Sequence, residues 1–263
     1  METTVINDST ISGVWCQMVK IIRGHTGTEL SPVLITLSDI DPVASEAFDP
    51  VRTALDAVLI NREFNSTNTV ANTIFPQSLY RFAKFDRQKL YKLYLDLVQR
   101  IKAIDRRNKD GIYFERLIRF DEINNWNQLD FVITEFNGRP GVRKSMLQAA
   151  IFDPNRDHKR VAQLGFPCMQ HVSFTYSNNQ LTLHAFYATQ QLFDKAYGNL
   201  LGLVRLANFM AREMHLALDK VSCYVGVEKL ERIPKWDPAL TSIIENSQQN
   251  LIHDGKPVVC QGS

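Results

Sequence analysis

The sequence predicts a single α/β domain over residues 1–263. Short segments rich in β-branched residues alternate with segments whose apolar residues recur every three or four positions, and these patterns are typical of strands and helices respectively. No internal repeat and no change in composition divides the chain. Because 44% of the residues are apolar and 22% are charged, the chain can bury a globular core. We therefore do not expect a disordered or collagen-like protein.

The N-terminal half of the chain is predicted to be mainly helical. Amphipathic spacing predicts helices over residues 14–22, 51–60, 82–104 and 127–137, and β-branched or apolar composition predicts strands over residues 32–38 and 143–152. Two prolines and several acidic residues predict a loop over 39–50. The charged stretch 105–111, which ends in glycine, is predicted to terminate the longest helix.

The C-terminal half has a clearer pattern. Residues 172–176 and 181–187 alternate between apolar and polar side chains and are joined by Ser177-Asn178-Asn179-Gln180, which predicts a β-hairpin. A long apolar stripe predicts a helix over 198–218, and β-branched residues predict a strand over 220–227.

Charge and cysteine content exclude several classes of protein. The formal net charge is +2, without a polybasic arm, so we expect no nucleic-acid partner. The four cysteines and six histidines lack metal-ligand spacing, so we expect no metal and a reducing, cytoplasmic location. The N-terminus does not resemble a signal peptide, and no run of about 18 apolar residues predicts a membrane span.

Cys168 is the most conspicuous candidate for chemistry. The sequence contains no P-loop, GxGxxG, HExxH or GxSxG motif. Cys168 follows Pro167 and leads directly into a predicted strand, which places its thiol at a strand edge after a rigid turn. One interpretation is a buried structural thiol, since free cysteine is among the most buried residue types. The other is a nucleophile, which would need a nearby positive charge to lower its pKa.

The segment Gly165–Gly202 resembles thymidylate synthase and its relatives, the pyrimidine nucleotide hydroxymethylases. In that family a Pro-Cys pair carries the nucleophile, and an asparagine in the first turn of a later helix reads the base. Pro167-Cys168 matches the pair, and Asn199 follows the cysteine by 31 positions, without a gap relative to the family pattern. The resemblance implies a layered α/β domain in which a large mixed sheet is backed by helices, and two such sheets pack in a symmetric homodimer.

Weaker similarities add further site residues. Tyr113 lies in a segment that resembles the one carrying an active-site tyrosine, and Thr189 keeps a hydroxyl where the family has serine. Arg143 and Lys144 correspond to a cationic pair that reaches the partner subunit's nucleotide phosphate, and residues 23–28 resemble the N-terminal phosphate loop. The resemblance therefore implies Cys168 and Tyr113 as catalytic residues, and Asn199, Arg143, Lys144, Thr189, Arg23 and His25 as substrate-binding residues.

The sequence also departs from the family. Met169 stands where histidine follows the cysteine. The Gln-Arg-Ser-x-Asp run becomes Tyr187-Ala188-Thr189-Gln190-Gln191, and the sugar-binding Gly-Asp-x-His-x-Tyr run becomes Gly226-Val227-Glu228-Lys229-Leu230-Glu231. The closing apolar tail becomes Lys256–Ser263. Recognition of phosphate and sugar is therefore expected to differ, and plain dUMP is not the expected substrate.

Each candidate also has a structural alternative. Asn199 beside a glycine could cap its helix, and Tyr113 could be a packing residue in a strand. Arg143 and Lys144 could be a solvated edge. His171 and His184 are expected to be partly buried polar residues. Glu228 and Glu231 are expected at the surface, and the alternative for them is a replacement contact for a different sugar or polar substituent.

From these features we expect a transferase that adds a one-carbon unit at C5 of a uracil-type pyrimidine. A covalent Cys168 adduct would carry the reaction, and methylene-tetrahydrofolate is the cofactor that the resemblance implies. The expected partners are a pyrimidine nucleoside or nucleotide and a second copy of the chain, with no nucleic acid and no membrane. The alternative is a non-catalytic or repurposed nucleotide-binding protein of the same fold.

Overall fold

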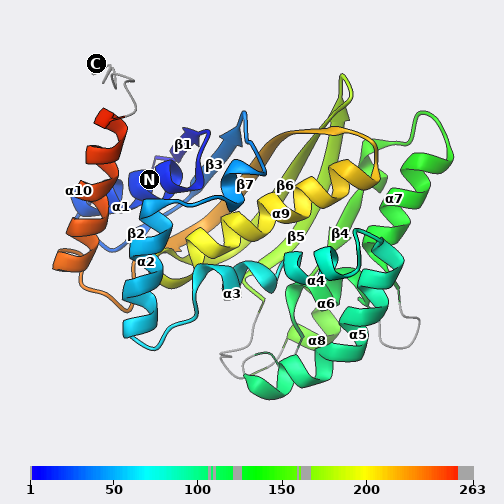
Figure 1. The fold of residues 1–263 in the computed structure, drawn as a ribbon, viewed down its shortest axis with the longest axis horizontal. Helices are drawn as coiled ribbons and strands as arrows, with labels where there is room; N and C mark the ends of the chain where they lie inside the picture. The colour runs from blue at the N-terminus through cyan, green and yellow to red at the C-terminus, as the bar shows by residue number, and fades with distance from the viewer. Residues whose placement is uncertain are drawn as a thin grey trace.

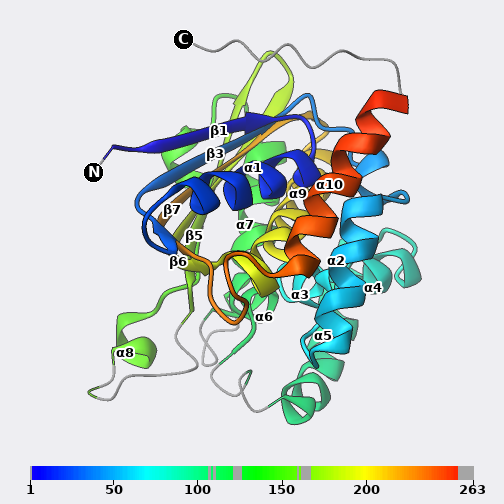
Figure 2. The same ribbon diagram turned by 90° about the vertical axis from the view of Figure 1, so that its left-hand side faces the viewer.

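The fold is organised around a seven-stranded mixed sheet with strand order β1-β3-β7-β6-β5-β4, in which β2 also pairs with β7. The computed structural model describes residues 2–105, 108, 111–120, 126–158, 160 and 167–253. The long helices lie against one face of the sheet (Figure 1, Figure 2). The predicted α/β class, with a large mixed sheet backed by helices, is therefore confirmed.

Most predicted strands are present. The strands are β1 Thr4–Asp8, β2 Glu29–Leu30, β3 Val33–Ser38, β4 Gln148–Ala150, β5 Met169–Ser177, β6 Gln180–Gln191 and β7 Ala217–Lys229. The hairpin of β5 and β6 turns at Asn178 and Asn179, which have φ values of 50° and 61° that asparagine tolerates well. The sequence analysis missed β1, which pairs in parallel with β3.

The helices form the covering layer. They are α1 Ile11–Gly24, α2 Pro50–Asn61, α3 Thr67–Asn72, α4 Gln77–Phe82, α5 Arg87–Ile104, α6 Tyr113–Ile118, α7 Gln128–Gly138, α8 Pro154–Asp157, α9 Tyr197–Glu213 and α10 Pro238–His253. Polar side chains cap several of them, such as Asp86 at α5 and Asn127 at α7. The predicted helices over 14–22, 51–60 and 127–137 are confirmed. Among the described residues, no helix has the length and apolar character needed to cross a membrane.

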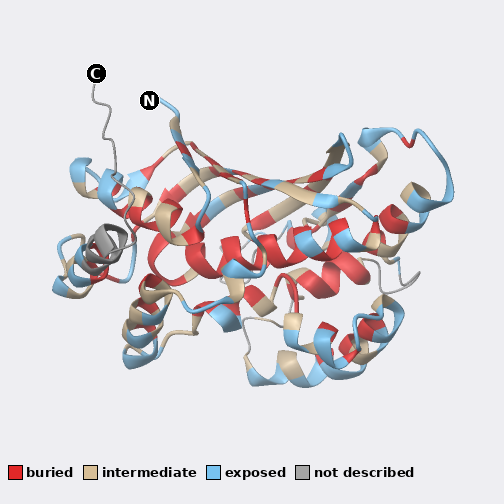
Figure 3. Cartoon of the chain, turned by 45° about the horizontal axis from the view of Figure 1, so that its top comes forward, coloured by how far each residue is buried: buried red, intermediate tan, exposed pale blue. Residues whose placement is uncertain are grey.

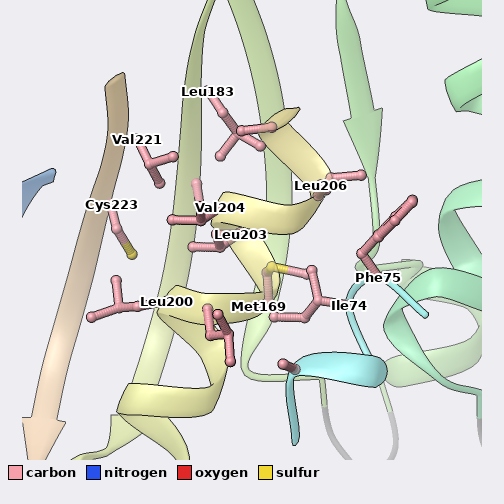
Figure 4. Close-up of a cluster of buried hydrophobic side chains, with 14 of the residues drawn as sticks. Ile74, Phe75, Met169, Leu183, Leu200, Leu203, Val204, Leu206, Val221 and Cys223 are labelled. Carbon is pink, nitrogen blue, oxygen red and sulfur yellow. The ribbon is translucent and has the colours of Figure 1, made fainter. Parts of the chain in front are cut away.

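Helix α9 is the centre of the core. Its Leu200, Leu203 and Val204 lie against Leu183 of β6 and Cys223 of β7 (Figure 4). All five of these side chains are buried. On another side of α9, a Cβ at residue 198 would lie 2.5 Å from the Val70 Cβ, so only glycine permits the close packing of α3 there.

Two predicted helices have wrong boundaries. The predicted helix 82–104 is divided between α4 and α5, because Lys84 and Phe85 have positive φ values of 58° and 61°. The predicted helix 198–218 ends at Glu213, after which His215 takes a φ of 55° and reverses the chain into β7. In both cases an ordinary residue adopts a left-handed conformation, which composition does not reveal.

Two strand predictions are also wrong. In the predicted strand 143–152 only Gln148–Ala150 is extended, and Lys144–Met146 forms a 3₁₀ turn. Tyr113, for which a strand position was expected, is the first residue of α6. The Glu115 carboxylate accepts a hydrogen bond from the Ile112 N–H at 3.3 Å, and this bond caps the start of the helix.

The sheet face opposite the helices carries a row of partly exposed apolar side chains. Paired residues place Val5, Leu34, Tyr224, Phe186 and His171 side by side on five neighbouring strands. The Phe186 and Tyr224 rings stack at 5.5 Å, although their residues remain 37% and 41% exposed. Figure 3 shows exposed and intermediate segments along these strands, whereas α9 is mostly buried. This row of five residues is called the open-face row below.

Candidate functional site

The predicted nucleophile lies at the end of the sheet where β6 and β7 finish. Cys168 immediately precedes β5, and its carbonyl accepts a hydrogen bond of 3.0 Å from the Ala188 N–H near the end of β6. Strand β7 runs parallel to β6, with Thr189 paired to Val227. Because α9 follows β6 through the π-helical turn Leu192–Ala196, its first turn starts from this same end of the sheet.

Tyr113, Cys168 and Thr189 meet there. The Thr189 hydroxyl donates to the Cys168 Sγ at 3.7 Å. The Met169 N–H donates to the Tyr113 Oη at 3.5 Å, which brings the phenol beside the backbone of the cysteine. Cys168 is partly exposed, and the following residue, Met169, points into the core near Ile74 (Figure 4). The structure therefore brings together three of the residues that the resemblance implies, from three distant parts of the sequence.

Burial keeps the Tyr113 phenol protonated at neutral pH. Desolvation is the largest influence that raises the pKa of Tyr113, and the neighbouring Cys168 raises it further. The helix that carries Tyr113 is fixed by Arg116, which binds the Asp157 carboxylate through two hydrogen bonds of 2.5 and 2.8 Å. Both ion-pair side chains are almost fully buried. This pair connects α6 to α8, and so holds Tyr113 in position.

Three buried polar side chains lie at the same end of β6 and β7, and the sequence analysis gave no role to two of them and considered a substrate contact only for Glu228. Tyr187, Gln190 and Glu228 are 0%, 2% and 0% exposed. Among the described residues, the Tyr187 hydroxyl, both amide atoms of Gln190 and both carboxyl oxygens of Glu228 have no hydrogen-bond partner. Tyr187 is near enough to Cys168, Tyr113 and Glu228 for each of them to raise the pKa of its phenol, after the larger effect of burial.

The expected surface position of Glu228 is therefore wrong. Burial raises the pKa of the Glu228 carboxyl well above its usual value, which favours the neutral acid. The charged residues next to Glu228 in the sequence favoured a surface position for it. Glu231 is exposed as expected, and Lys229 forms a 2.8 Å ion pair with Glu29. Gln190 and Glu228 are paired across β6 and β7, and this pairing can be inferred only when the order of the strands is known.

The two strands change phase together near the thiol. Strict alternation from Tyr187 would bury Thr189, and strict alternation from Val225 would bury Val227, but the next buried residues are Gln190 and Glu228. The irregularity lies at Ala188 and Gly226, where a Cβ on the glycine would be 2.7 Å from the Ala188 carbonyl oxygen. The phase change turns two polar side chains inward and exposes the Thr189 hydroxyl beside Cys168.

Asn199 occupies the first turn of α9 and is 5% exposed. It is the third residue of the helix, and the residue at the cap position is Ala196, so the interpretation of Asn199 as an N-cap is wrong. Its buried place at the helix start, at the same end of the sheet as Cys168, remains compatible with a binding role.

Of the two N-terminal candidates, Arg23 lies in the last turn of α1 and His25 directly follows that helix. Arg23 donates to the Lys235 carbonyl at 3.0 Å and to the Thr241 hydroxyl at 2.9 Å, and its guanidinium lies over the Trp236 ring. His25 is exposed, and its carbonyl accepts a hydrogen bond from the Lys235 ammonium. The segment before α10 therefore engages the Arg23 side chain, and only His25 is presented to solvent.

Arg143 and Lys144 do not join the site within one chain. Both are exposed, and the Lys144 ammonium lies 5.5 Å from the centre of the Tyr176 ring. Tyr176 is near the far end of β5 from Cys168, about eight residues or roughly 26 Å along an extended strand. In the single chain these residues match the solvated-edge alternative.

The remaining titratable residues give no second centre within the described residues. His171 and His184 are partly buried as expected, and burial lowers the pKa of both. Cys16 and Cys223 are buried, while Cys260 and the tail Lys256–Ser263 lie outside the described residues. Searched over the described part of the chain, histidine, cysteine and carboxylate side chains form no group that could hold a metal ion.

The arrangement combines a partly exposed thiol, a hydroxyl that can donate to it and a phenol that keeps its proton. The Thr189 hydroxyl lies within hydrogen-bonding distance of the sulfur that would act as the nucleophile. The set is therefore suited to nucleophilic addition by sulfur. Comparison with protein-family models finds no match for the chain, and a search of curated proteins likewise finds none.

Proposed function

We propose that the chain is a thymidylate-synthase-like transferase that adds a one-carbon unit at C5 of a uracil-type pyrimidine through a covalent Cys168 adduct. The observation that carries the proposal is the meeting of Tyr113, Cys168 and Thr189 at one end of the sheet. Tyr113 and Thr189 are implied by the resemblance alone, whereas Cys168 is also indicated by its place between Pro167 and a strand. Their convergence from positions 55 and 21 residues apart supports the fold and the site that it implies.

The thiol would start the reaction. The Cys168 thiolate attacks C6 of the ring, the new S–C6 bond forms, and the C5–C6 π electrons move into an enolate that makes C5 nucleophilic. The Thr189 hydroxyl stabilises the thiolate before attack and after release. The Tyr113 phenol holds its proton at Oη throughout the neutral pH range. After C5 has formed its bond to the one-carbon unit, a solvent base would take the C5 proton, and the C–H electron pair would restore the C5–C6 double bond as the S–C6 bond breaks and the Cys168 thiolate departs.

The implied cofactor, methylene-tetrahydrofolate, would supply the electrophilic carbon. Its pterin-type ring is a nitrogen heterocycle with adjacent hydrogen-bond donors and acceptors. The unpartnered amide of Gln190 and the carboxyl of Glu228 have matching chemistry, so these residues fit such a ring and would be the ones to hold it.

The same proposal includes a homodimer formed through the open-face row. Exposed apolar patches of this kind are uncommon on monomers and mark interaction surfaces. A second copy related by a two-fold axis would cover the row with the same row. It would also provide a route by which the exposed Arg143 and Lys144 could approach the site of the other subunit.

A nucleotide-binding protein without catalysis is the second candidate. It is favoured by the distance of Arg143 and Lys144 from Cys168, since a nucleophilic thiol requires a cation or another device that lowers its pKa. In that case the cavity would bind a pyrimidine without forming a bond to it.

Adduct formation with 5-fluoropyrimidines separates the two candidates. The purified protein is incubated with 5-fluorouracil nucleosides and nucleotides, with and without methylene-tetrahydrofolate, and analysed by intact mass and peptide mapping. Fluorine at C5 cannot leave as a proton does, so the S–C6 adduct is trapped. We expect an adduct on the peptide containing Cys168, which Cys168→Ser abolishes while ligand binding persists.

The buried Cys16 provides the matched control, because Cys16→Ser should form the adduct normally. Iodoacetamide should likewise label Cys168 before Cys16 and Cys223, and a bound pyrimidine should slow that labelling. If no fluoropyrimidine forms an adduct and no selective labelling occurs, the transferase proposal is wrong, and ligand binding alone would support the second candidate.

A further inference from the structure

We propose that Gln190 and Glu228 form a specificity pair that hydrogen-bonds one edge of a neutral nitrogen heterocycle. The inference rests on the proposed function, because it assigns a role to residues at the same end of the sheet as Cys168. The two residues face each other on the parallel strands β6 and β7. Both are at least 98% buried, and neither side chain has a hydrogen-bond partner in the part of the chain that the structure describes.

Partner-free polar groups of this kind are rare in a folded interior. Buried amide and carboxyl groups nearly always find a hydrogen-bond partner, since removal from water is costly without one. The pair presents four such atoms, namely two from each side chain. Although a neutral carboxyl and a primary amide have complementary groups, the two side chains make no hydrogen bond to each other in the structure, so neither satisfies the other. A ligand with its own donors and acceptors can satisfy both.

The environment identifies which ligand chemistry is compatible. Burial favours the neutral acid of Glu228, which offers one donor and one acceptor, and the Gln190 amide offers both kinds as well. A phosphate would bring a negative charge to a carboxyl group that lacks a cation, so an anion is disfavoured here. A lactam or amidine edge of an uncharged ring presents adjacent donors and acceptors in one plane, and it matches the pair.

The pair lies beside the reactive thiol. Tyr187, three residues before Gln190, is buried with an unpartnered hydroxyl and is close enough to both Cys168 and Glu228 for their charges to act on its phenol. The phase change of β6 and β7 turns Gln190 and Glu228 to the buried side at this end of the sheet. Gln190 and Glu228 belong to the two sequence runs for which the resemblance implies contacts to phosphate and sugar. Their buried amide and carboxyl groups are instead suited to hydrogen-bonding a ring.

Two rings in the proposed reaction have this chemistry, namely the pyrimidine and the pterin. The experiment measures equilibrium binding by calorimetry in two arms, one with uridine, deoxyuridine and their monophosphates, and one with tetrahydrofolate. The variants are Gln190→Leu, Glu228→Leu and the milder Glu228→Gln, which keeps a neutral donor and acceptor. The matched control is Gln180→Leu, at the exposed start of the same strand. Circular dichroism verifies that each variant is folded.

We expect Gln190→Leu and Glu228→Leu to weaken binding by about tenfold or more in one arm, in line with the loss of one or two hydrogen bonds. Glu228→Gln should remain within a few-fold of the wild type, and Gln180→Leu should not change. A loss in the first arm assigns the pair to the pyrimidine, and a loss in the second assigns it to the pterin. If Glu228→Leu fails to fold, Gln190→Leu and Glu228→Gln carry the comparison.

Wild-type affinity for both ligand classes in Gln190→Leu and Glu228→Leu, or in Gln190→Leu where Glu228→Leu does not fold, would overturn the inference. So would the absence of wild-type binding in both arms at millimolar ligand. Its failure is distinct from that of the proposed function. An adduct on Cys168 with unaltered binding in the variants removes the specificity pair and keeps the transferase. Weakened binding without any adduct in the wild type keeps the pair and removes the transferase.

Discussion

Replacing Gly226 by alanine should destabilise the protein and disturb the thiol site. The new Cβ would lie 2.7 Å from the Ala188 carbonyl oxygen and 3.5 Å from its carbonyl carbon. Because the obstructing atoms belong to the backbone of a neighbouring strand, they cannot move aside as a flexible side chain can. Ala188 is also the residue whose N–H binds the Cys168 carbonyl, so its displacement is transmitted to the nucleophile.

Overpacking of this kind costs about 1–3 kcal/mol. For a chain of this size the melting temperature falls by roughly 2–4 °C per kcal/mol, so we expect Gly226→Ala to melt about 2–12 °C below the wild type. The assay is thermal unfolding followed by circular dichroism, together with the rate of Cys168 alkylation. Gly24→Ala is the control, because no atom lies within 4 Å of its new Cβ. If Gly226→Ala melts with the wild type and its thiol reacts at the same rate, our account of the close strand contact is refuted.

Three further predictions follow from the sheet, the buried ion pair and the sequence departures. Light scattering should give a mass twice the chain mass of 30.1 kDa. The variant Tyr224→Asp, in the open-face row, should have the mass of a single chain. A monomeric wild type at micromolar concentration would contradict the dimer. Asp157→Asn should lower the free energy of unfolding, measured in urea, by about 3–5 kcal/mol, whereas the surface variant Glu135→Gln should lower it by about 0.5 kcal/mol or less. Equal losses in the two variants would contradict a structural role for the buried pair. Burial acts to raise the pKa of the Asp157 carboxyl, but the hydrogen bonds from Arg116 lower that pKa overall. The stability that the Asp157 carboxylate contributes should therefore be complete above pH 3.8, and it should be lost as the pH falls through the lower pKa of the folded state. Purified protein should not convert dUMP to thymidylate at a useful rate, because Ala188 stands where the resemblance implies a phosphate-binding arginine and each lost charged hydrogen bond is worth about 1.5–3 kcal/mol. Rapid turnover would contradict this interpretation.

Periodicity predicted the elements that owe their structure to local sequence. Helix α1 and the hairpin of β5 and β6 were found because their apolar residues follow one period throughout. Strand β1 was missed because its five residues carry a single buried side chain, Ile6, and it is held by pairing with β3. The start of α6 at Tyr113 was missed because its cap depends on Glu115, three residues after Ile112, in a segment interpreted as a strand.

The candidate site likewise contains residues whose positions follow from local sequence and residues whose positions depend on the tertiary structure. The proximity of Cys168 to Thr189 agrees with what the resemblance implied, because a hairpin with a short turn fixes the register between the two residues. The position of Arg143 and Lys144 could not be deduced, since it depends on which end of β5 the preceding segment reaches. The segment that binds Arg23 lies more than 200 residues away in the chain, and only the tertiary structure reveals that contact.

The inward position of Glu228 results from two strands acting together. Taken alone, β7 carries Glu228 between Val227 and Lys229, and strict alternation from Val225 turns the acid toward solvent. The phase change at Gly226 reverses that outcome, and it can occur only because β6 makes the same change at Ala188 and the glycine allows the two backbones to approach. A side chain at residue 226 would therefore remove both the close contact and the reason for an inward acid. The stability of Gly226→Ala and the ligand binding of the Glu228 variants are therefore two independent tests of the same feature, the phase change of β6 and β7.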